Sequence, residues 1–294
     1  MSKTKINLPL EVKEIDLKKY TTYHVGGKGL GLFTPSNIDE LISVLKYLRQ
    51  NKIKYKVLGS GSNVIFNNSG YDGYIIKLDA FSDLEIFGRE ITVGAGYSLP
   101  RLAMKACLGN LTGLEFASGI PGTIGGAVFM NAGAYKSDMG YIVKSVTVLT
   151  PDYQVKTMTN KECDFHYRTS FFMKHPDYIC LSAHIVLKRG KKEAIMALMN
   201  DRKKRRIESQ PLDFPSAGSV FRNPDGDSAG RIIESLGLKG EKIGDALVST
   251  KHANFIVNNG NATGEDIKKL ILKVQKIVKE KTGIELKIEQ EFVE

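Results

Sequence analysis

The chain has 294 residues, 42% of them hydrophobic and 25% charged, and a formal net charge of +10. This length allows two or three packed units, and the composition is that of an ordinary globular protein rather than a disordered chain. The three cysteines, Cys107, Cys163 and Cys180, are far apart and form no C-x-x-C pair, so we expect neither a disulfide framework nor a metal site. Because no signal-peptide pattern and no apolar run of about 18 residues occur, we expect a soluble, cytoplasmic protein.

The first half of the chain predicts strands mixed with two helices. Ser36 begins a predicted capping box with Asp39, and apolar residues at helical spacing follow as far as Leu48. Alternating residues 53–57 predict a strand that leads directly into a glycine-rich turn. The spacing of apolar residues also predicts a helix at 99–108 and strands at 74–78, 91–93, 143–150 and 179–187.

A basic helix follows in the second half. Helical periodicity runs from Lys192 to Ile207 and includes the sequence RKKRR at 202–206. Such a cluster could bind nucleic acid, attract a phosphorylated small molecule, or lie in solvent. We favour a solvated helix end, because cations there meet the negative end of the helix dipole.

The remainder of the chain predicts two more helices and a closing strand. A proline-punctuated stretch at 210–224 precedes a short helix at 229–236, and a last helix begins with a capping box of Thr263 and Asp266 and ends at Gly283. Residues 284–292 then alternate apolar and charged side chains, which predicts a half-buried strand with an acidic outer face. Strands and helices do not alternate regularly, so an α+β fold is favoured.

Two glycine-rich segments are candidates for binding a nucleotide cofactor. GSGSN at 59–63 follows a predicted strand, and SGIPGTIGGAVFMNAGAY at 118–135 combines five glycines with almost no charge. Either could be a tight turn. Val64 stands where a dinucleotide fingerprint needs its third glycine, and no G-K-[ST] follows, so a Rossmann site and a P-loop are both disfavoured. Neither segment contains lysine or arginine, so a bound diphosphate would depend on main-chain N–H groups.

Ser219, in the sequence SAGSVFRNP, is a candidate without the surroundings of a nucleophile. Phe221 stands where the G-x-S-x-G elbow needs a glycine, and no histidine lies between His184 and His252. A turn residue is the alternative interpretation. If Ser219 is chemical, another role is needed for it.

Several ordered blocks resemble one known family. They are VLGSGSNVIF, GLEFASGIPGTIGGAVFMNAGAY, YRTSFF, QPLDFPSAGSVFRNP, AGRIIESLGLKGEKIGDALVSTKHANFIVN and GIELKIEQE. Their order and sequence are similar to those of UDP-N-acetylenolpyruvoylglucosamine reductases (UDP-N-acetylmuramate dehydrogenases). Only 51 positions separate Arg168 from Ser219, so the chain resembles the short form of the family, which lacks the tyrosine-loop insertion.

The resemblance implies an enzyme with non-covalent FAD and with NADPH as hydride donor. It would reduce UDP-N-acetylglucosamine enolpyruvate to UDP-N-acetylmuramate for bacterial peptidoglycan, with these small molecules rather than nucleic acid or membrane as partners. The implied fold is the two-part FAD-binding fold of the vanillyl-alcohol oxidase and p-cresol methylhydroxylase type, followed by an α+β substrate-binding domain. We expect FAD-binding subdomains at 1–80 and 81–190 and the substrate domain at 191–294, with 284–294 returning to the active site. A flavin-dependent oxidase of the same superfamily and a non-enzymatic nucleic-acid binder are the competing hypotheses.

The resemblance also assigns the site residues. Arg168 and Glu289 would flank the substrate carboxylate, with Glu291 as the alternative glutamate, and Ser219 would deliver a proton to the carbanion. Ser209 and Gln210 stand where the longer form carries a lysine that contacts the diphosphate. The residues implied to bind the cofactor are Gly59, Ser60, Gly61, Ser62, Asn63, Ser118, Gly119, Ile120, Pro121, Gly122, Thr123, Gly125 and Gly126. Those implied to bind the UDP-sugar are Tyr135, Tyr167, Arg206 and Asn223.

Overall fold

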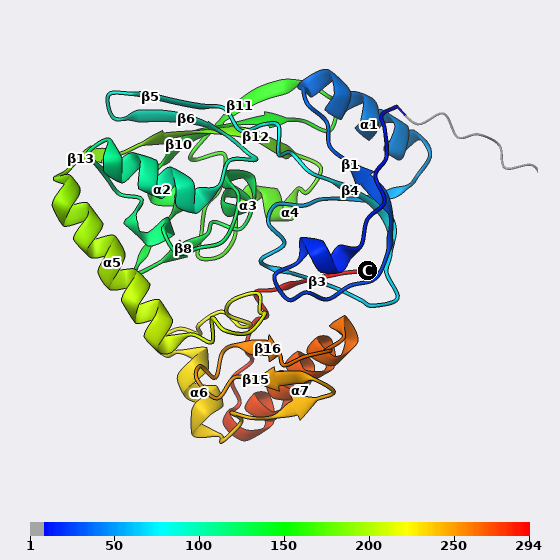
Figure 1. Cartoon of the computed structure of the whole chain (residues 1–294), viewed down its shortest axis with the longest axis vertical. Helices are drawn as coiled ribbons and strands as arrows, with labels where there is room; N and C mark the ends of the chain where they lie inside the picture. The colour runs from blue at the N-terminus through cyan, green and yellow to red at the C-terminus, as the bar shows by residue number, and fades with distance from the viewer. Residues whose placement is uncertain (1–8) are drawn as a thin grey trace, which may run out of the picture.

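A computed structural model describes residues 9–294 (Figure 1). The chain forms a parallel sheet near its N-terminus, a larger antiparallel sheet in its middle and a small antiparallel sheet near its C-terminus. Helices are interspersed with these sheets, which confirms the predicted α+β class. Within residues 9–294, no helix is both long and apolar enough to cross a membrane.

The first sheet has three parallel strands in the order β1-β4-β2, and helix α1 follows its first strand. The helix begins differently from the prediction: Asn37 is the N-cap, and its side chain accepts a hydrogen bond from the Glu40 amide at 2.9 Å. Ser36 instead donates its backbone N–H and its hydroxyl to the Glu40 carboxylate, at 2.8 and 2.7 Å. The predicted box of Ser36 and Asp39 is therefore wrong by one position, because Asn37 takes the N-cap and makes Glu40 its third helical residue. The elements are β1 (Gly29–Phe33), α1 (Ile38–Gln50), β2 (Lys54–Val57) and β4 (Tyr71–Ile76).

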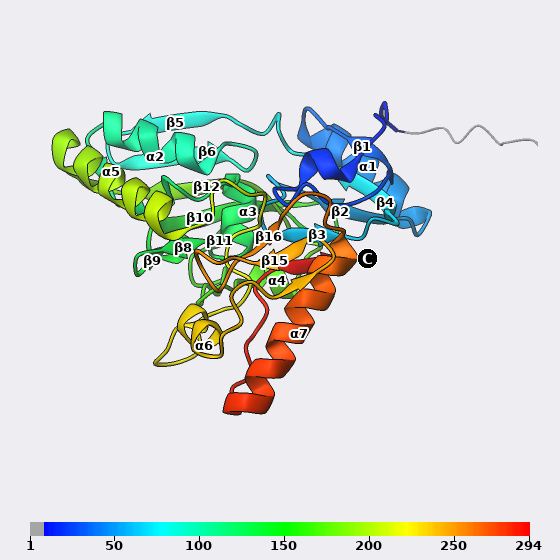
Figure 2. The ribbon, with the colours of Figure 1, turned by 60° about the horizontal axis from the view of Figure 1, so that its bottom comes forward.

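The second sheet is antiparallel and has the strand order β11-β10-β12-β6-β5. Helix α3 packs on β12 and β6, and Figure 2 shows α5 running beside α2, which it contacts. Ile195 and Met199 of α5 belong to the same buried cluster as this sheet, although the predicted boundary at residue 190 assigns α5 to the next unit. The elements are β5 (Leu84–Phe87), β6 (Glu90–Gly94), α2 (Leu99–Leu108), α3 (Ile124–Phe129), β10 (Val143–Leu149), β11 (Val155–Thr159), β12 (Ile179–Val186) and α5 (Lys192–Ser209).

The third sheet is small, and helix α7 packs against all three of its strands. The predicted capping box is confirmed: Asp266 N donates to Thr263 Oγ1, and Thr263 N donates to the Asp266 carboxylate, both at 3.0 Å. Gly283 ends the helix with a left-handed φ of +74°, which suits a residue without a Cβ. The elements are α6 (Ala229–Ser235), β14 (Lys242–Ile243), β15 (Ala246–Val248), β16 (Ile256–Asn258) and α7 (Gly264–Thr282).

The closing segment returns to the N-terminal part of the chain. Its strand β17 (Glu291–Val293) pairs in parallel with β3 (Val64–Phe66), just after the first glycine-rich turn. Of the predicted strand at 284–292, only Glu291 and Phe292 lie in a strand. The expected acidic outer face is wrong for Glu289, whose side chain is 12% exposed. The segment has neighbours on both sides, because Glu289 N bonds Val220 O and Glu291 N bonds Asn63 O. Alternating polarity therefore does not report exposure here.

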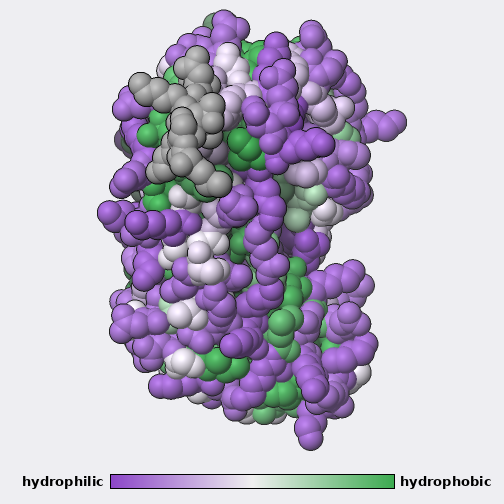
Figure 3. Space-filling view, turned by 90° about the vertical axis from the view of Figure 1, so that its right-hand side faces the viewer, coloured by the Kyte–Doolittle hydropathy of each residue, from purple (hydrophilic) through white to green (hydrophobic). Residues whose placement is uncertain are grey.

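The other predicted helices and strands are found within a few residues of their expected bounds. Figure 3 shows a mainly hydrophilic face with small, separate hydrophobic areas, as the composition indicates for a globular protein. The domain boundaries at residues 80 and 190 stay a prediction, and residues 1–8 of the first unit lie outside the described residues. The remaining short elements are η1 (Leu17–Tyr20), β7 (Leu111–Thr112), η2 (Glu115–Ala117), β8 (Gly133–Ala134), β9 (Ser137–Asp138), η3 (Met139–Tyr141), α4 (Phe171–Lys174) and β13 (Lys188–Arg189).

Candidate active site

A cavity of about 1020 Å³ is lined by residues from all three sheet regions and from the closing segment. Arg168, Ser219 and Glu289, the three predicted catalytic residues, all line it. So do eleven of the thirteen predicted cofactor residues, the exceptions being Ser118 and Gly119. Ligand cavities commonly have volumes of about 300–1000 Å³, so this one is large enough for a cofactor and part of a substrate.

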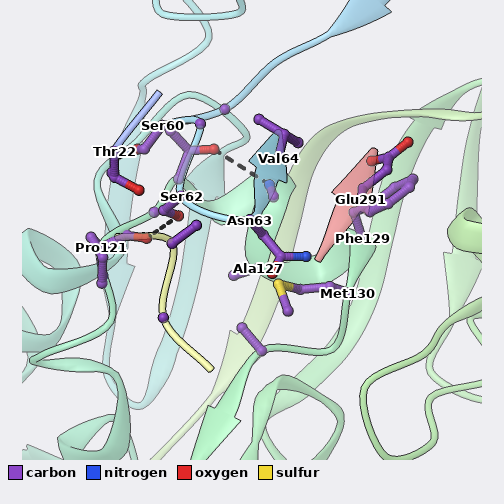
Figure 4. Close-up of a pocket in the computed structure, with 18 of the residues that line it drawn as sticks. Thr22, Ser60, Ser62, Asn63, Val64, Pro121, Ala127, Phe129, Met130 and Glu291 are labelled. Carbon is purple, nitrogen blue, oxygen red and sulfur yellow. Dashed lines mark hydrogen bonds between the residues drawn. The ribbon is translucent and has the colours of Figure 1, made fainter. Parts of the chain in front are cut away.

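The turn GSGSN at 59–63 joins β2 to β3 along the cavity wall. Gly61 has a φ of +65°, and a Cβ there would lie 1.8 Å from Tyr20 O, so the turn requires glycine at this position. Ser62 donates its hydroxyl hydrogen to Pro121 O at 2.6 Å (Figure 4). This bond joins the two glycine-rich segments that the sequence separates by more than fifty residues.

The second glycine-rich segment runs into α3, whose N-cap Thr123 accepts a hydrogen bond from Gly126 N at 3.3 Å. A Cβ on Gly59 would lie 2.7 Å from Thr123 Oγ1, so the first loop packs closely against the Thr123 side chain. Ser118 and Gly119 face a second cavity of about 610 Å³, which is also lined by Arg206. Pro121 and Arg206 line both cavities, so Ser118 and Gly119 border the main cavity without lining it.

Arg168 and Glu289 form an ion pair in the cavity wall, with 3.0 Å between Arg168 Nε and Glu289 Oε1. Both side chains are largely buried, at 18% and 12% exposure. Arg168 also donates from Nη2 to Gly133 O at 2.5 Å, and its φ of +52° is left-handed, a conformation that costs a non-glycine residue on the order of 1 kcal/mol. Burial raises the pKa of Glu289, and the positive charges of Arg168 and Arg222 only partly oppose this.

Glu291, the alternative glutamate, has a different partner. Its Oε1 lies 2.5 Å from Lys56 Nζ, on the neighbouring part of the cavity wall. Figure 4 shows Glu291 on β17 near Phe129, whose ring centroid lies 5.5 Å from Lys56 Nζ. The contacts therefore favour Glu289 as the partner of Arg168.

Ser219 lies on a turn in which Gly218 has a φ of +73°. Among residues 9–294, the Ser219 hydroxyl has no hydrogen bond to another side chain. Of the five histidines, only His24 lines the cavity within the described residues. The next residue, Val220, accepts a hydrogen bond through its carbonyl from Glu289 N at 2.8 Å. The turn is thus attached to the segment that carries Glu289, and the Ser219 hydroxyl stays available to a ligand.

Three of the four residues implied to bind the UDP-sugar line the same cavity. Asn223 N donates to Tyr167 Oη at 3.4 Å, so these two residues are neighbours. Arg206 is partly buried, burial lowers its pKa, and within the described chain no acidic side chain pairs with it. Tyr135 is absent from the cavity lining: it donates to Arg202 O at 3.2 Å, and its ring centroid lies 4.8 Å from the Arg202 guanidinium carbon.

Sequence reasoning gave no role to four other residues of this region. Thr22 Oγ1 and Gln210 Oε1 line the cavity, are buried, and have no hydrogen-bond partner within residues 9–294. Lys56 pairs with Glu291 of the closing segment, and Gln290, within that segment, donates to Ala217 O. No local pattern distinguishes these four side chains, because long-range contacts give them their positions.

The cavity fits a large, flat ligand with a diphosphate. Gly59 and Gly61 leave no room for a side chain, and the main-chain N–H groups of such loops can donate to a diphosphate. The Thr22 hydroxyl is buried in the wall and has no partner within residues 9–294. A family model described as FAD binding domain matches residues 30–159. The crystal structure of 6-hydroxy-D-nicotine oxidase from Arthrobacter nicotinovorans has the same fold, with a TM-score of 0.50 at 14% identity over 64% of this chain and 44% of that one. The fold and the site therefore define a flavoprotein with a two-part FAD-binding fold.

Comparisons over the whole chain are more specific. The model for the C-terminal domain of UDP-N-acetylenolpyruvoylglucosamine reductase matches residues 210–293. The enzyme of that name from Caldanaerobacter subterraneus is 46% identical to this chain, over 94% of this chain and 91% of that protein. The enzyme from Bacillus subtilis is 42% identical, over 94% of this chain and 92% of that protein. The Thermus caldophilus enzyme has a crystal structure with a TM-score of 0.84 at 36% identity, over 97% of this chain and 99% of that one. The chain belongs to the UDP-N-acetylenolpyruvoylglucosamine reductase family, which confirms the predicted resemblance.

Proposed function

We propose that the protein reduces UDP-N-acetylglucosamine enolpyruvate to UDP-N-acetylmuramate, with FAD as cofactor and NADPH as reductant. The observation that supports this most is the buried pair of Arg168 and Glu289 in the cavity that Ser219 and the glycine loops also line. An enol ether with a carboxylate needs a cation at that carboxylate and a proton donor at the neighbouring carbon. Arg168 and Ser219 are side chains of these two kinds.

Bound FAD would supply a hydride, obtained from NADPH, to the methylene carbon of the enolpyruvyl group. Residues 59–63 and 120–126 would bind it through main-chain N–H groups, with Thr22 Oγ1 as an additional polar contact.

Negative charge then develops on the carbon next to the substrate carboxylate. Arg168 would bind this carboxylate, and its bonds to Glu289 and Gly133 O fix its direction before substrate arrives. Burial raises the pKa of Glu289, which favours its protonated form. A protonated Glu289 would not repel the substrate carboxylate beside it. Ser219 would donate its hydroxyl proton to the carbanion and recover one from water.

Arg206 and Gln210 support binding of the UDP diphosphate in place of the lysine of the longer form. Arg206 is a partly buried cation, and within the described residues it has no acidic partner. By contrast, Arg205 and Lys204 of the same helix pair with Asp201 and Glu208, at 2.8 and 3.9 Å, on the solvent side. This favours a small anionic ligand over nucleic acid.

The NADPH and UDP-sugar substrates of the proposed reaction are cytoplasmic metabolites, so we place the reaction in the cytoplasm.

Anaerobic and aerobic assays of the FAD-loaded protein test this function. NADPH consumption that depends on the enolpyruvyl substrate is expected, whereas steady peroxide formation without such dependence would support the flavin oxidase. Flavin absorbance of the purified protein separates both enzymes from the nucleic-acid binder.

Ser219→Ala tests the assigned proton donor. We expect reduction of the flavin by NADPH to stay within twofold of the parent, while oxidation of reduced flavin by substrate slows by at least ~10², because only the second step needs the proton. The two half-reactions are measured separately by stopped-flow absorbance. Equal slowing of both would assign Ser219 a structural role.

A further inference from the structure

Gln290 is a buried residue that follows Glu289 in the chain and contacts the turn that carries Ser219. It is 4% exposed, and it does not line the cavity. Its Nε2 lies 3.1, 3.3 and 3.4 Å from the carbonyl oxygens of Ala217, Gly218 and Ser219. Its Oε1 accepts a hydrogen bond from Tyr23 Oη at 3.0 Å. Both ends of the amide are therefore satisfied by protein groups, as a buried amide requires.

The turn that carries Ser219 presents three consecutive carbonyls to this one amide. Such a turn depends on Gly218, whose φ of +73° is left-handed. Ser219 lines the cavity and Gln290 does not, so the amide bonds act on the turn from outside the cavity. They restrict the peptide from which the Ser219 hydroxyl extends.

The same segment is also attached to the predicted cofactor loop. Asn63 Nδ2 donates to Glu289 O at 3.1 Å, and Figure 4 shows the Asn63 side chain directed at the start of β17. Tyr23, which bonds Gln290, follows Thr22, whose N–H donates to Gly61 O at 3.1 Å. Gln290 thus lies at a joint between the Ser219 turn, the Glu289 segment and the cofactor loop.

We propose that Gln290 is a positioning residue that fixes Ser219 relative to Glu289 and the cofactor loop. The proposal rests on the proposed reductase function. Proton transfer requires close and well-oriented groups, and a displacement of about 1 Å can cost ~10²-fold in rate. An apolar side chain of the same size would fill the space of Gln290, but it would leave the carbonyls of the turn without their donor. The turn would then relax, and proton transfer from Ser219 would slow.

Gln290→Leu is the test, and Gln275→Leu is its matched control. Gln275 also donates from Nε2 to a carbonyl of the closing segment, Leu286 O at 2.8 Å, but it lies outside the cavity lining. With FAD-loaded protein and stopped-flow absorbance, we expect Gln290→Leu to slow oxidation of reduced flavin by substrate at least tenfold. Reduction by NADPH should stay within twofold, and Gln275→Leu should leave both steps within twofold.

Combining Gln290→Leu with Ser219→Ala distinguishes positioning from a general structural effect. If Gln290 acts through the Ser219 hydroxyl, the Gln290 change should cost less than twofold once that hydroxyl is absent. A tenfold cost in the Ser219→Ala background would overturn the proposal, as would equal slowing of both half-reactions by Gln290→Leu. A parent protein that consumes no enolpyruvyl substrate would contradict the reductase function itself.

Gln290→Glu covers the case in which the leucine variant does not retain FAD. A carboxyl at this position can donate to the carbonyls of the turn only while it is protonated. As pH falls, the rate of flavin oxidation by substrate in Gln290→Glu should therefore rise as a fraction of the parent's rate. The corresponding ratio for flavin reduction by NADPH should not change. A ratio to the parent that does not change with pH would overturn the proposal.

Discussion

At the scale of single residues, the buried carboxyl of Glu289 is the most unusual group in the cavity. Its side chain is 12% exposed and has one close cationic partner, Arg168. Removing a carboxylate from water costs more than this pairing returns, so burial raises the pKa of Glu289 above its ordinary value of 4.5. The ion pair is therefore evidence for function rather than for stability.

Glu289→Gln should become more stabilising, relative to the parent, as pH rises. A raised pKa means that the folded protein retains the Glu289 proton to a higher pH than the unfolded chain. The stability this provides is complete below the unfolded pKa of about 4.5 and is lost as pH rises through the folded pKa. Glutamine stays neutral and can still accept from Arg168, so the free energy of unfolding of the variant should gain on the parent by about 1.4 kcal/mol for each unit of pKa difference.

Urea unfolding of both FAD-loaded proteins between pH 4.5 and 8 measures this gain. Glu291→Gln, which removes a carboxylate from the same segment and from the Lys56 pair, is the control for a general effect of charge. A gain of Glu289→Gln that is constant with pH would contradict the assignment. The pH–rate profile of Glu289→Gln should also differ from that of the parent if Glu289 holds a proton beside the substrate carboxylate.

At the scale of elements, local patterns in the sequence were sufficient for the long helices. The capping box of Thr263 and Asp266 and the stop at Gly283 are local signals, and α7 has these bounds. The cap of α1 was missed because Ser36 and Asn37 are both good N-caps, and Glu40 decides between them. The exposure of Glu289 was missed for another reason: partners at Asn63, Arg168 and Val220 are distant in sequence.

The candidate site was predictable mainly through the resemblance of its ordered blocks to a family. Chemistry alone gave Ser219 no base, and Arg168 had no visible partner in the sequence. Contacts such as Ser62 with Pro121, or Gln290 with the Ser219 turn, depend on the assembled fold. Side chains of this kind become visible only when distant segments are brought together.

Gly61→Ala should weaken FAD binding because the turn between β2 and β3 has no room for a Cβ. The added atom would lie 1.8 Å from Tyr20 O, in addition to the strain of a φ of +65°. The control is Gly88→Ala, because Gly88 has nearly the same φ, +63°, and nothing within 4 Å of the added atom. Gly88→Ala should cost about 1 kcal/mol of stability and leave the dissociation constant for FAD unchanged.

Flavin fluorescence titration compares the two glycine variants. We expect the dissociation constant of Gly61→Ala to rise at least tenfold, since backbone must move to relieve the clash. Equal FAD affinity in both variants would show that the turn accommodates a side chain and does not form the cofactor cradle.

At the scale of the whole molecule, the chain closes on itself. Strand β17, at the C-terminus, pairs with β3, which directly follows the GSGSN turn, so the chain end is attached beside the cofactor loop and its Glu291 lines the cavity. Val293 is 7% exposed and belongs to the same buried cluster as Leu17 and Phe66. Cofactor binding and the stability of the C-terminal segment should therefore be coupled.

Deletion of residues 292–294 tests this coupling while it keeps Glu289, Gln290 and the Glu291 amide bond to Asn63 O. Losing the burial of Val293 should cost roughly 1.5–3 kcal/mol, and the loss of strand pairing to Ile65 and Phe66 adds to it. Since FAD would stabilise the closed chain, its dissociation constant should rise at least tenfold. The control is deletion of Glu294 alone, which removes an exposed side chain paired with Lys268 and should change neither quantity measurably. A deletion of 292–294 with the parent's urea midpoint and FAD affinity would mean that β17 follows the fold without contributing to it.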